Sequence, residues 1–377
     1  MKTIIYISHE GNLMKGSTYS LLNLINSVSE NIRPVIIVPS DGIACAEFKK
    51  KGIKYYIVPF NLTFTEKHGI KRILTFLPRY IRDRKKNNAA AKIIKQIVIA
   101  EGAHIIHTNT AAVDVGQKVA TELDLKHVWH LREFLSLDFS LNPLIGWKLF
   151  LKKINKADTI ICITKSVCEH YKMVNNKKAY VIFNAVRPYN KIHLNLNKEN
   201  YFLFCGAVTA QKGIEDALMA FSKFSKTYPD FKMVVAGTVK DNYAGRLSKL
   251  LKELQIDENV QLTGFKTDVD DLMANAKCLL MCSKNEALGR VTIEAMYNGC
   301  PVIGFAAGGT LEILENNRTG YLYNTMDELV EKMFYVIANK TNVTQLISQA
   351  QEYAQNTFSE EKYADSLMKI YDNLLLN

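Results

Sequence analysis

A chain of 377 residues is about twice the usual size of a domain, so the sequence predicts two domains that each bury a core. Hydrophobic residues make up 48% and charged residues 23%, a balance typical of globular proteins that excludes a mainly disordered chain. The formal net charge of +11 indicates an anionic partner: nucleotide phosphate, lipid headgroup or nucleic acid.

The first residues, Met1 to Ser8, form a short apolar run that leads directly into His9. The run lacks the length and the cleavage pattern of a signal peptide, so we expect it to be the first strand of a cytoplasmic protein. No stretch approaches the roughly 18 apolar residues that a membrane-spanning helix needs. The seven cysteines are scattered and odd in number, which favours reduced thiols over a disulfide framework or a zinc site.

The N-terminal half alternates short β-branched runs with amphipathic segments of helical length. The predicted strands are Thr3–Ser8, Val35–Pro39, Lys54–Val58, Ile105–Thr108, Val128–His130, Thr159–Thr164 and Tyr180–Phe183. This alternation is typical of βαβ units and predicts a doubly wound, Rossmann-like α/β domain over residues 1–186.

A polar segment with a proline follows at 187–200, and its lack of a hydrophobic period indicates a linker. A second alternating series predicts another Rossmann-like domain over 201–357. Its predicted strands are Tyr201–Cys205, Met233–Ala236, Val260–Leu262, Cys278–Cys282, Pro301–Phe305 and Gly320–Tyr323. Residues 358–377 carry apolar side chains at helical spacing, which predicts a C-terminal helix that docks back on the N-terminal domain. Two such domains form a cleft between the carboxyl ends of two sheets, where open α/β folds bind ligands.

The segment Ser283–Tyr323 is the densest motif of the chain. It contains a loop with Glu286, a helix with Glu294, a Gly-Cys-Pro turn, and a Gly-Gly loop that enters a second helix. The amides of Leu288–Arg290 and Gly308–Thr310 would begin the two helices. Helix N-termini present unpaired N–H groups and partial positive charge, so both ends suit an anionic diphosphate.

This string resembles the signature of the retaining GT-B glycosyltransferases of family 4. In that signature two glutamates, separated by seven residues, precede Ala-Met, Gly-x-Pro-Val and Gly-Gly-x-x-Glu. The resemblance implies the GT-B fold, two Rossmann-like domains facing a central cleft. It also implies that Glu286 approaches the hydroxyls of the donor sugar and that Glu294 accepts hydrogen bonds from the ribose. The implied enzyme transfers a hexosyl or N-acetylhexosaminyl group from a UDP-sugar with retention of configuration.

A second block, residues 204–216, resembles the turn that opens the C-terminal domain of this family. The resemblance implies a donor-binding set of Gly206, Thr209, Lys212, Glu286, Leu288, Gly289, Arg290 and Glu294. Lys212 matches the family pattern, whereas Ala207 stands where the family has an arginine. A missing guanidinium beside a dianionic leaving group weakens transition-state stabilisation, so we expect Arg290 to replace it.

Residues 128–133 resemble the strand end that carries the active-site histidine of the family, here His130. From the resemblance we therefore expect a catalytic set of His130, Glu286, Lys212 and Arg290. His107, at the end of another predicted strand, is a second candidate. Arg132, together with Gly16 and Ser17 in the turn after the first strand, is expected on the acceptor side.

The resemblance implies no metal ion and no cofactor, because Lys212, Arg290 and the helix ends take the place of a divalent cation. The leaving phosphate itself helps to deprotonate the acceptor. Asp268 and Asp270 have the Asp-x-Asp spacing of metal-dependent transferases. They precede a predicted helix, so we interpret them as a helix cap or a solvated face.

The segment Lys67–Lys95 contains ten lysine and arginine residues and only one acidic residue, Asp83. One interpretation is a helix with a solvated basic face. The other is a basic, aromatic-bearing surface that lies peripherally on the anionic inner face of the membrane. The second interpretation fits a glycan or lipid-linked acceptor of bacterial surface polysaccharide or glycoconjugate synthesis.

Two other activities remain open. A sugar-nucleotide epimerase of the same fold would leave the sugar on the nucleotide, and a catalytically weak relative would bind sugar nucleotide without transfer. The residue at 207 motivates the second alternative. No helix-turn-helix, zinc finger or RNA-binding signature accompanies the basic charge, so we expect no nucleic acid partner.

Overall fold

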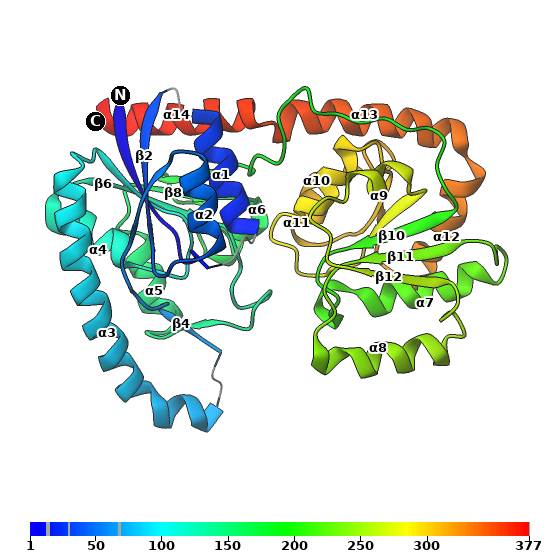
Figure 1. The fold of residues 1–377 in the computed structure, drawn as a ribbon, viewed down its shortest axis with the longest axis horizontal. Coiled ribbons are helices and arrows are strands. Elements are labelled where there is room, and N and C mark those ends of the chain that lie inside the picture. Colours follow the sequence, from blue (N-terminus) through cyan, green and yellow to red (C-terminus); the bar gives the residue numbers. More distant parts are fainter. Residues whose placement is uncertain (13–15, 29–30, 67–68, 377) are drawn as a thin grey trace. The chain divides into compact units, whose positions relative to one another are not determined.

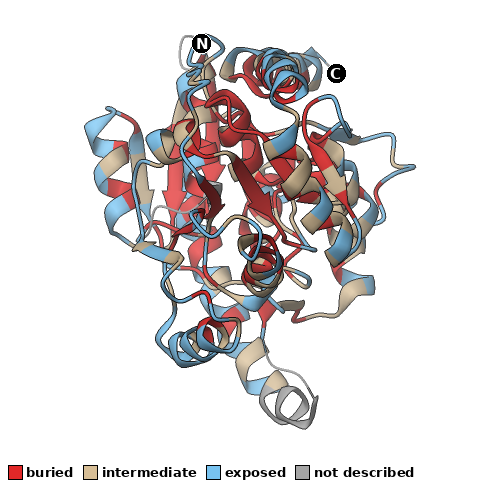
Figure 2. Cartoon of the chain, turned by 90° about the vertical axis from the view of Figure 1, so that its right-hand side faces the viewer, coloured by how far each residue is buried: buried red, intermediate tan, exposed pale blue. Residues whose placement is uncertain are grey.

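The structure is a computed structural model that describes residues 1–12, 16–28, 31–66 and 69–376. The chain forms two compact units (Figure 1). Unit 1 comprises Met1–Ala185 and Glu360–Asn377, and unit 2 comprises Val186–Ser359. The strands form the buried centre, and the exposed residues lie mostly on helices and loops (Figure 2).

Unit 1 contains a seven-stranded parallel sheet in the order β3-β2-β1-β5-β6-β8-β9. These strands are β1 (Lys2–Ile7), β2 (Ile32–Val38), β3 (Lys54–Ile57), β5 (Ile105–Thr108), β6 (Lys126–Leu131), β8 (Thr159–Cys162) and β9 (Ala179–Val181). The helices are α1 (Gly16–Val28), α2 (Ile43–Lys50), α3 (Gly69–Ala100), α4 (Val115–Leu123), α5 (Trp147–Ile154), α6 (Lys165–His170) and α14 (Glu360–Leu376). A short antiparallel pair, β4 (Phe64–Thr65) with β7 (Asn142–Pro143), is an element that the sequence pattern did not predict.

Alternate residues of the central strands enter two different cores. Ile4 and Tyr6 of β1 pack with residues of α1, α2 and α14 on one face of the sheet. Ile5 and Ile7 pack with residues of α3 and α4 on the other face. Side chains of a strand alternate between faces, so a strand covered by helices on both sides must be apolar at every position. This requirement explains the continuous apolar runs in the sequence.

The C-terminal helix α14 belongs to unit 1 and packs against α1. Its buried side chains recur at helical spacing and include Tyr363, Leu367 and Tyr371. The two tyrosines therefore lie on the face of α14 that is directed into unit 1, two turns apart.

Unit 2 contains a six-stranded parallel sheet in the order β12-β11-β10-β13-β14-β15. Its strands are β10 (Tyr201–Cys205), β11 (Lys232–Ala236), β12 (Val260–Gly264), β13 (Cys278–Met281), β14 (Val302–Phe305) and β15 (Tyr321–Tyr323). Its helices are η1 (Ala210–Lys212), α7 (Ile214–Ser225), α8 (Asp241–Glu253), α9 (Asp270–Asn275), α10 (Arg290–Tyr297), α11 (Gly308–Ile313), α12 (Met326–Ala338) and α13 (Lys340–Phe358). Residues 187–200 carry no helix or strand.

Local sequence explains where several of these helices begin. The hydroxyl of Thr325 accepts a hydrogen bond from the amide of Glu328 at 3.2 Å and caps α12. The hydroxyl of Thr164 does the same for the amide of Val167 at α6, at 3.1 Å. Both caps satisfy an amide that has no partner within its own helix.

Two further sequence predictions concern the whole chain. All seven cysteines are free thiols, in agreement with the predicted absence of a disulfide framework. None of the helices in the described ranges has both the length and the apolar character needed to cross a bilayer.

Candidate active site

The predicted donor-binding residues of unit 2 gather where the strand order of its sheet reverses. β10 pairs with β11 on one side and with β13 on the other, so the chain leaves these neighbouring strands in opposite directions. Such a point is the usual ligand site of an open α/β sheet. Lys212 follows β10, and Glu286 follows β13.

Lys212 and Glu286 form an ion pair across this point. Nζ of Lys212 lies 2.7 Å from Oε2 and 3.1 Å from Oε1 of Glu286. The lysine side chain is 38% exposed and the glutamate side chain 17% exposed, so the pair is partly open to a ligand. Residues that are 74 positions apart in the sequence thus meet at one site.

The loop that carries Glu286 rests on the Gly-Gly turn at the start of α11. A Cβ atom on Gly309 would lie 2.6 Å from the carbonyl oxygen of Leu288, and one on Gly308 would lie 2.6 Å from that of Glu286. Gly308 also has a φ of +54°, which favours glycine. The close contact explains why this turn consists of two glycines.

One sequence prediction about this turn is wrong. The amide of Gly309 was expected to be available for a diphosphate, but it donates a hydrogen bond of 2.6 Å to the carbonyl oxygen of Glu286. The bond fixes the loop instead. The anion-binding prediction therefore fails for the amide of Gly309, and it stays a prediction for the start of α10.

Gly289 caps α10 with a φ of +87° and precedes Arg290 and Glu294. Nε of Arg290 lies 2.7 Å from Oε1 of Glu294, one helical turn further on. The arginine is therefore bound to the glutamate that was predicted to hold the ribose. This contact gives Arg290 a second potential role besides charge compensation, namely orienting Glu294.

The first turn of the site, after β10, contains Gly206, Ala207 and Thr209. The φ of Gly206 is +139°, and a Cβ atom on Gly237 would lie 1.7 Å from the carbonyl oxygen of Gly206. The two strand ends therefore touch through backbone. Thr209 precedes the η1 turn that ends at Lys212, and Ala207 is exposed. An arginine at position 207 would have room for its side chain.

In unit 1, His107 and His130 lie at the carboxyl ends of the neighbouring strands β5 and β6. Nε2 of His107 is 3.2 Å from Nδ1 of His130, and both side chains are fully buried. Burial lowers the pKa of each histidine well below its ordinary value, and the charge of Arg132 acts in the same direction. Both imidazoles are therefore neutral near pH 7, and each carries a single N–H.

Arg132 is buried and bound to three neutral acceptors. Nε donates to Oδ1 of Asn109 at 2.8 Å, a terminal nitrogen donates to Oδ1 of Asn184, and the other lies 3.2 Å from the Tyr363 hydroxyl. A buried cation without a bound carboxylate is costly unless an anion joins it. Arg132 is therefore suited to hold an anionic group of a substrate.

The neighbouring Glu133 does not balance that charge at neutral pH. The pKa of Glu133 is raised to about 8, mainly by burial and also by the charge of Asp138, while Arg132 opposes the shift. Part of the residue is exposed, but Oε1 is buried and makes no hydrogen bond within the described residues. Glu133 is accordingly protonated near pH 7, which leaves the charge of Arg132 uncompensated.

The remaining predictions in the first unit concern Gly16 and Ser17. These residues are the first two of α1, and their side chains lie outside the described part of the chain. Tyr363 was predicted only as an apolar position of the last helix, and its hydroxyl contact with Arg132 was missed. The available signal was the presence of tyrosines on the buried face of that helix.

The Asp-x-Asp triplet is structural. Oδ1 of Asp268 accepts a hydrogen bond of 2.9 Å from the amide of Asp270 at the start of α9, as a cap would. Asp270 is not solvated as expected, because Arg187 binds both of its carboxylate oxygens. No group of three or more His, Cys, Asp or Glu residues suited to a metal ion occurs in the described ranges.

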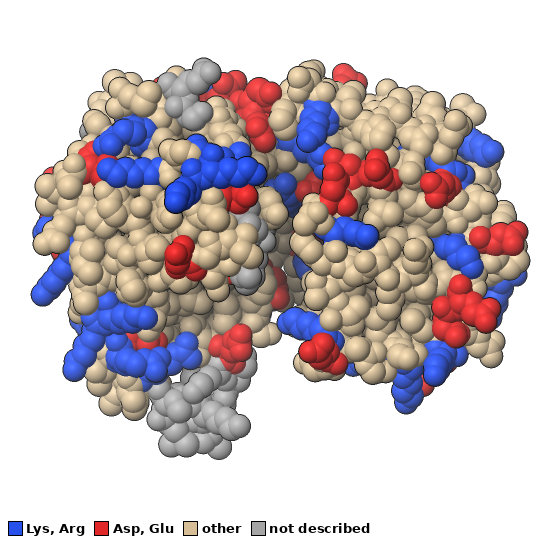
Figure 3. Space-filling model, in the orientation of Figure 1, with Lys and Arg blue, Asp and Glu red and all other residues tan. Residues whose placement is uncertain are grey.

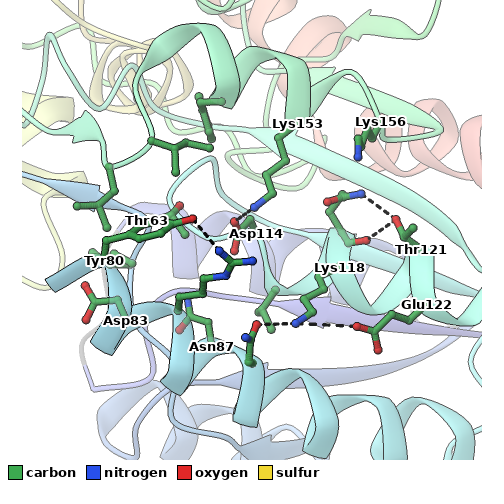
Figure 4. A pocket seen from close by; sticks show the side chains of 18 residues that line it. Thr63, Tyr80, Asp83, Asn87, Asp114, Lys118, Thr121, Glu122, Lys153 and Lys156 are labelled. Carbon is green, nitrogen blue, oxygen red and sulfur yellow. Dashed lines mark hydrogen bonds and ion pairs between the residues drawn. The ribbon is translucent and has the colours of Figure 1, made fainter. Parts of the chain in front are cut away.

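Unit 1 also contains a cavity of about 380 Å³ between α3, α4 and α5 (Figure 4). It contains none of the sequence-predicted site residues. Lys153 forms an ion pair with Asp114 at its wall, and Lys118 donates to Oδ1 of Asn88 at 2.5 Å. Its lining combines these paired charges with apolar side chains such as Leu144, Ile145 and Phe150.

Comparison with known proteins relates this chain to glycosyltransferases. Residues 187–356 match the family model of Glycosyl transferases group 1. An uncharacterised glycosyltransferase of Methanocaldococcus jannaschii is 28% identical over 294 residues, which cover 76% of this chain and 80% of that protein. The N-acetyl-alpha-D-glucosaminyl L-malate synthase of Bacillus anthracis is 26% identical over 255 residues, or 64% of this chain and 65% of the synthase.

Among solved structures, HepE of Anabaena in complex with UDP superposes with a TM-score of 0.82 at 18% sequence identity. The alignment covers 99% of this chain and 100% of HepE. The fold is therefore GT-B, with parallel sheets in two Rossmann-like domains. Together with the family match, these relatives support a GT-B glycosyltransferase.

Proposed function

We propose that this protein is a metal-independent, retaining glycosyltransferase of family 4 that uses a UDP-sugar. It transfers a hexosyl or N-acetylhexosaminyl group to a hydroxyl of a glycan or lipid-linked acceptor in the synthesis of bacterial surface polysaccharide or glycoconjugate. The observation that carries the proposal is the Lys212–Glu286 pair at the switch point of unit 2. UDP in the HepE structure and the glucosaminyl group in the name of the Bacillus anthracis relative support the choice of donor.

The chemistry is a substitution at the anomeric carbon of the sugar. The bond between this carbon and the β-phosphate oxygen breaks, and the acceptor oxygen forms a bond on the same face. The proton of the acceptor passes to the departing phosphate, which leaves as UDP. Lys212 stabilises the charge that develops on this phosphate, Glu286 binds sugar hydroxyls, and Glu294 binds the ribose.

Donor binding and transfer can be tested together on the purified protein. We expect UDP and UDP-sugars, but not GDP or ADP, to raise the unfolding temperature by about 5 °C at roughly a hundredfold excess over Kd. Radiolabelled UDP-glucose or UDP-N-acetylglucosamine should transfer its sugar to a lipid and glycan extract, and EDTA should not prevent this. Label that stays on the nucleotide in a different sugar would identify an epimerase. Loss of transfer with EDTA that magnesium restores would show that a metal is required.

We further propose that α3 rests on an anionic lipid surface. Basic side chains gather over the described part of α3 (Figure 3). Leu77 is 60% exposed and Ile81 45% exposed, and Arg84 and Lys85 follow on the same helical stripe. Arg79 does not contribute to this surface, because it binds Asp83, the Thr65 hydroxyl and a backbone carbonyl. Exposed apolar and basic groups on one face are typical of interfacial helices.

Liposome sedimentation tests this surface. Binding to vesicles with anionic lipid should be strong at low salt and weak at high salt, since each nearby cation contributes on the order of 1 kcal/mol. Replacing Arg84 and Lys85 of this stripe, together with the adjacent exposed Lys86, with Gln should reduce the bound fraction several-fold. The matched control replaces Lys49, Lys50 and Lys51 with Gln, which removes the same charge from the exposed end of α2. Equal losses in both triple variants would mean that net charge, and not α3, drives binding.

A further inference from the structure

A chain of four buried side chains connects the C-terminal helix of unit 1 to the predicted active-site histidine. The Tyr6 hydroxyl lies 3.0 Å from that of Tyr371, which lies 2.7 Å from Nδ1 of His107. Nε2 of His107 lies 3.2 Å from Nδ1 of His130. The chain ends at Nε2 of His130, which is buried and has no hydrogen-bond partner in the described residues.

The four donors of this chain make three hydrogen bonds, so either direction of donation leaves one buried donor unpaired, and the two directions differ in which donor that is. Burial raises the pKa of Tyr6 and of Tyr371, so both hydroxyls keep their protons. If His130 donated to His107 and His107 to Tyr371, then Tyr371 would donate to Tyr6, and the unpaired donor would be the Tyr6 hydroxyl, within the hydrophobic core of unit 1. A buried donor without an acceptor is costly, and no ligand reaches a hydroxyl within this core, so that cost would persist in the substrate complex.

The opposite direction uses every donor except the last. Tyr6 donates to Tyr371, Tyr371 donates to Nδ1 of His107, and the Nε2–H of His107 donates to Nδ1 of His130. A phenol is a strong donor and an imidazole nitrogen a strong acceptor, in agreement with the 2.7 Å distance between Tyr371 and His107. His130 must then carry its proton on Nε2.

We propose that Tyr371 and His107 are positioning residues that hold His130 in its Nε2–H tautomer, as a hydrogen-bond donor to an oxygen atom of the bound substrate. His130 is thus not a general base. A hydrogen-bond donor at this position suits a transfer in which the leaving phosphate, and not His130, takes the proton of the acceptor hydroxyl. Nε2 is buried, so a substrate oxygen reaches it only after the side chains that cover it move. The role of His130 toward substrate depends on the proposed function, whereas its tautomer can be measured without any substrate.

The last helix of the chain serves the site twice. Tyr371 of α14 binds His107, and Tyr363, two turns earlier on the same face, binds Arg132. This helix follows the whole of unit 2 in the sequence. It nevertheless positions two predicted site residues of unit 1, His130 through His107, and Arg132 directly. The charged or titratable groups around the histidine pair are Tyr6 from β1, His127 and Arg132 from β6 and its end, and Tyr363 from α14.

Imidazole ¹⁵N NMR on protein labelled at histidine measures the tautomer directly. We expect His130, assigned from the signal lost in His130→Gln, to show a protonated Nε2 and an unprotonated Nδ1 near pH 7. Tyr371→Phe removes the donor to His107, so both histidines should then populate two tautomers. The matched control is Tyr297→Phe, which removes a buried hydroxyl bound to the carbonyl of Ala354 in unit 2. A proton on Nδ1 of His130, or an unchanged tautomer in Tyr371→Phe, overturns the proposal.

Kinetics test the role toward substrate. Tyr371→Phe should lower kcat about tenfold while donor KM and the unfolding temperature stay close to those of Tyr297→Phe. His130→Gln should retain more activity than His130→Glu, because an amide can donate a hydrogen bond and a carboxylate cannot. If the glutamate variant is the more active one, His130 acts as an acceptor and the proposal is wrong. If wild-type protein transfers no sugar but the tautomer is as expected, the proposed function fails and the positioning by Tyr371 stands.

Discussion

Replacing Lys212 with Ala is expected to lower kcat on the order of a thousandfold, with a smaller change in donor KM. The ammonium lies where the loops after β10 and β13 meet, 2.7 Å from Glu286. The additional negative charge on the departing phosphate develops in the transition state. Loss of the lysine that stabilises this charge should therefore appear mainly in kcat. Removal of the lysine also leaves the carboxylate of Glu286 without its partner beside that phosphate. Steady-state kinetics with a UDP-sugar measure both parameters.

The matched control for this variant is Lys284→Ala. Lys284 lies on the same loop as Glu286 and also pairs with a carboxylate, that of Asp216 at 3.2 Å, but its side chain is 60% exposed and it is not one of the predicted donor-binding residues. Its replacement should leave kcat within about twofold of the wild-type value. Equal kcat in wild type and Lys212→Ala would remove Lys212 from the mechanism. A comparable loss in both variants would indicate a general dependence on the charge of the loop.

Replacing Arg290 with Ala is expected to lower kcat/KM about a hundredfold. Two effects contribute. Arg290 is predicted to supply the positive charge that an arginine at position 207 would supply in the family pattern, and its Nε lies 2.7 Å from Oε1 of Glu294. The first effect should appear in kcat and the second in donor KM, because the ribose does not react.

A second substitution separates these effects. If charge compensation dominates, Ala207→Arg should restore about tenfold of the activity lost in Arg290→Ala. If Arg290 mainly orients Glu294, Ala207→Arg should have no effect and Glu294→Gln should reproduce the rise in KM. Arg318→Ala is the control, since Arg318 pairs with Glu315 in the same unit but is 59% exposed. Wild-type kinetics in Arg290→Ala would exclude both roles.

The fold could be predicted from the sequence because its main signals are local. Strands covered on both faces must be apolar at every position, and the runs around Ile5 and Val35 show this without any tertiary information. Part of the glutamate motif also reflects close packing. The loop of Glu286 rests against the start of α11, and only glycines at positions 308 and 309 leave room for it. The β4–β7 pair was missed because two-residue strands carry no detectable period.

The arrangement of the site was decided by contacts between residues that are distant in the sequence. Tyr371 lies 264 positions from His107, and nothing in the apolar spacing of its helix distinguishes a core tyrosine from one that binds a histidine. Arg79 appeared to be one cation among many until the fold placed Thr65 against it, in addition to its helical neighbour Asp83. A local pattern specifies which face of an element is buried, whereas the partner of a buried polar group depends on the element that packs against that face.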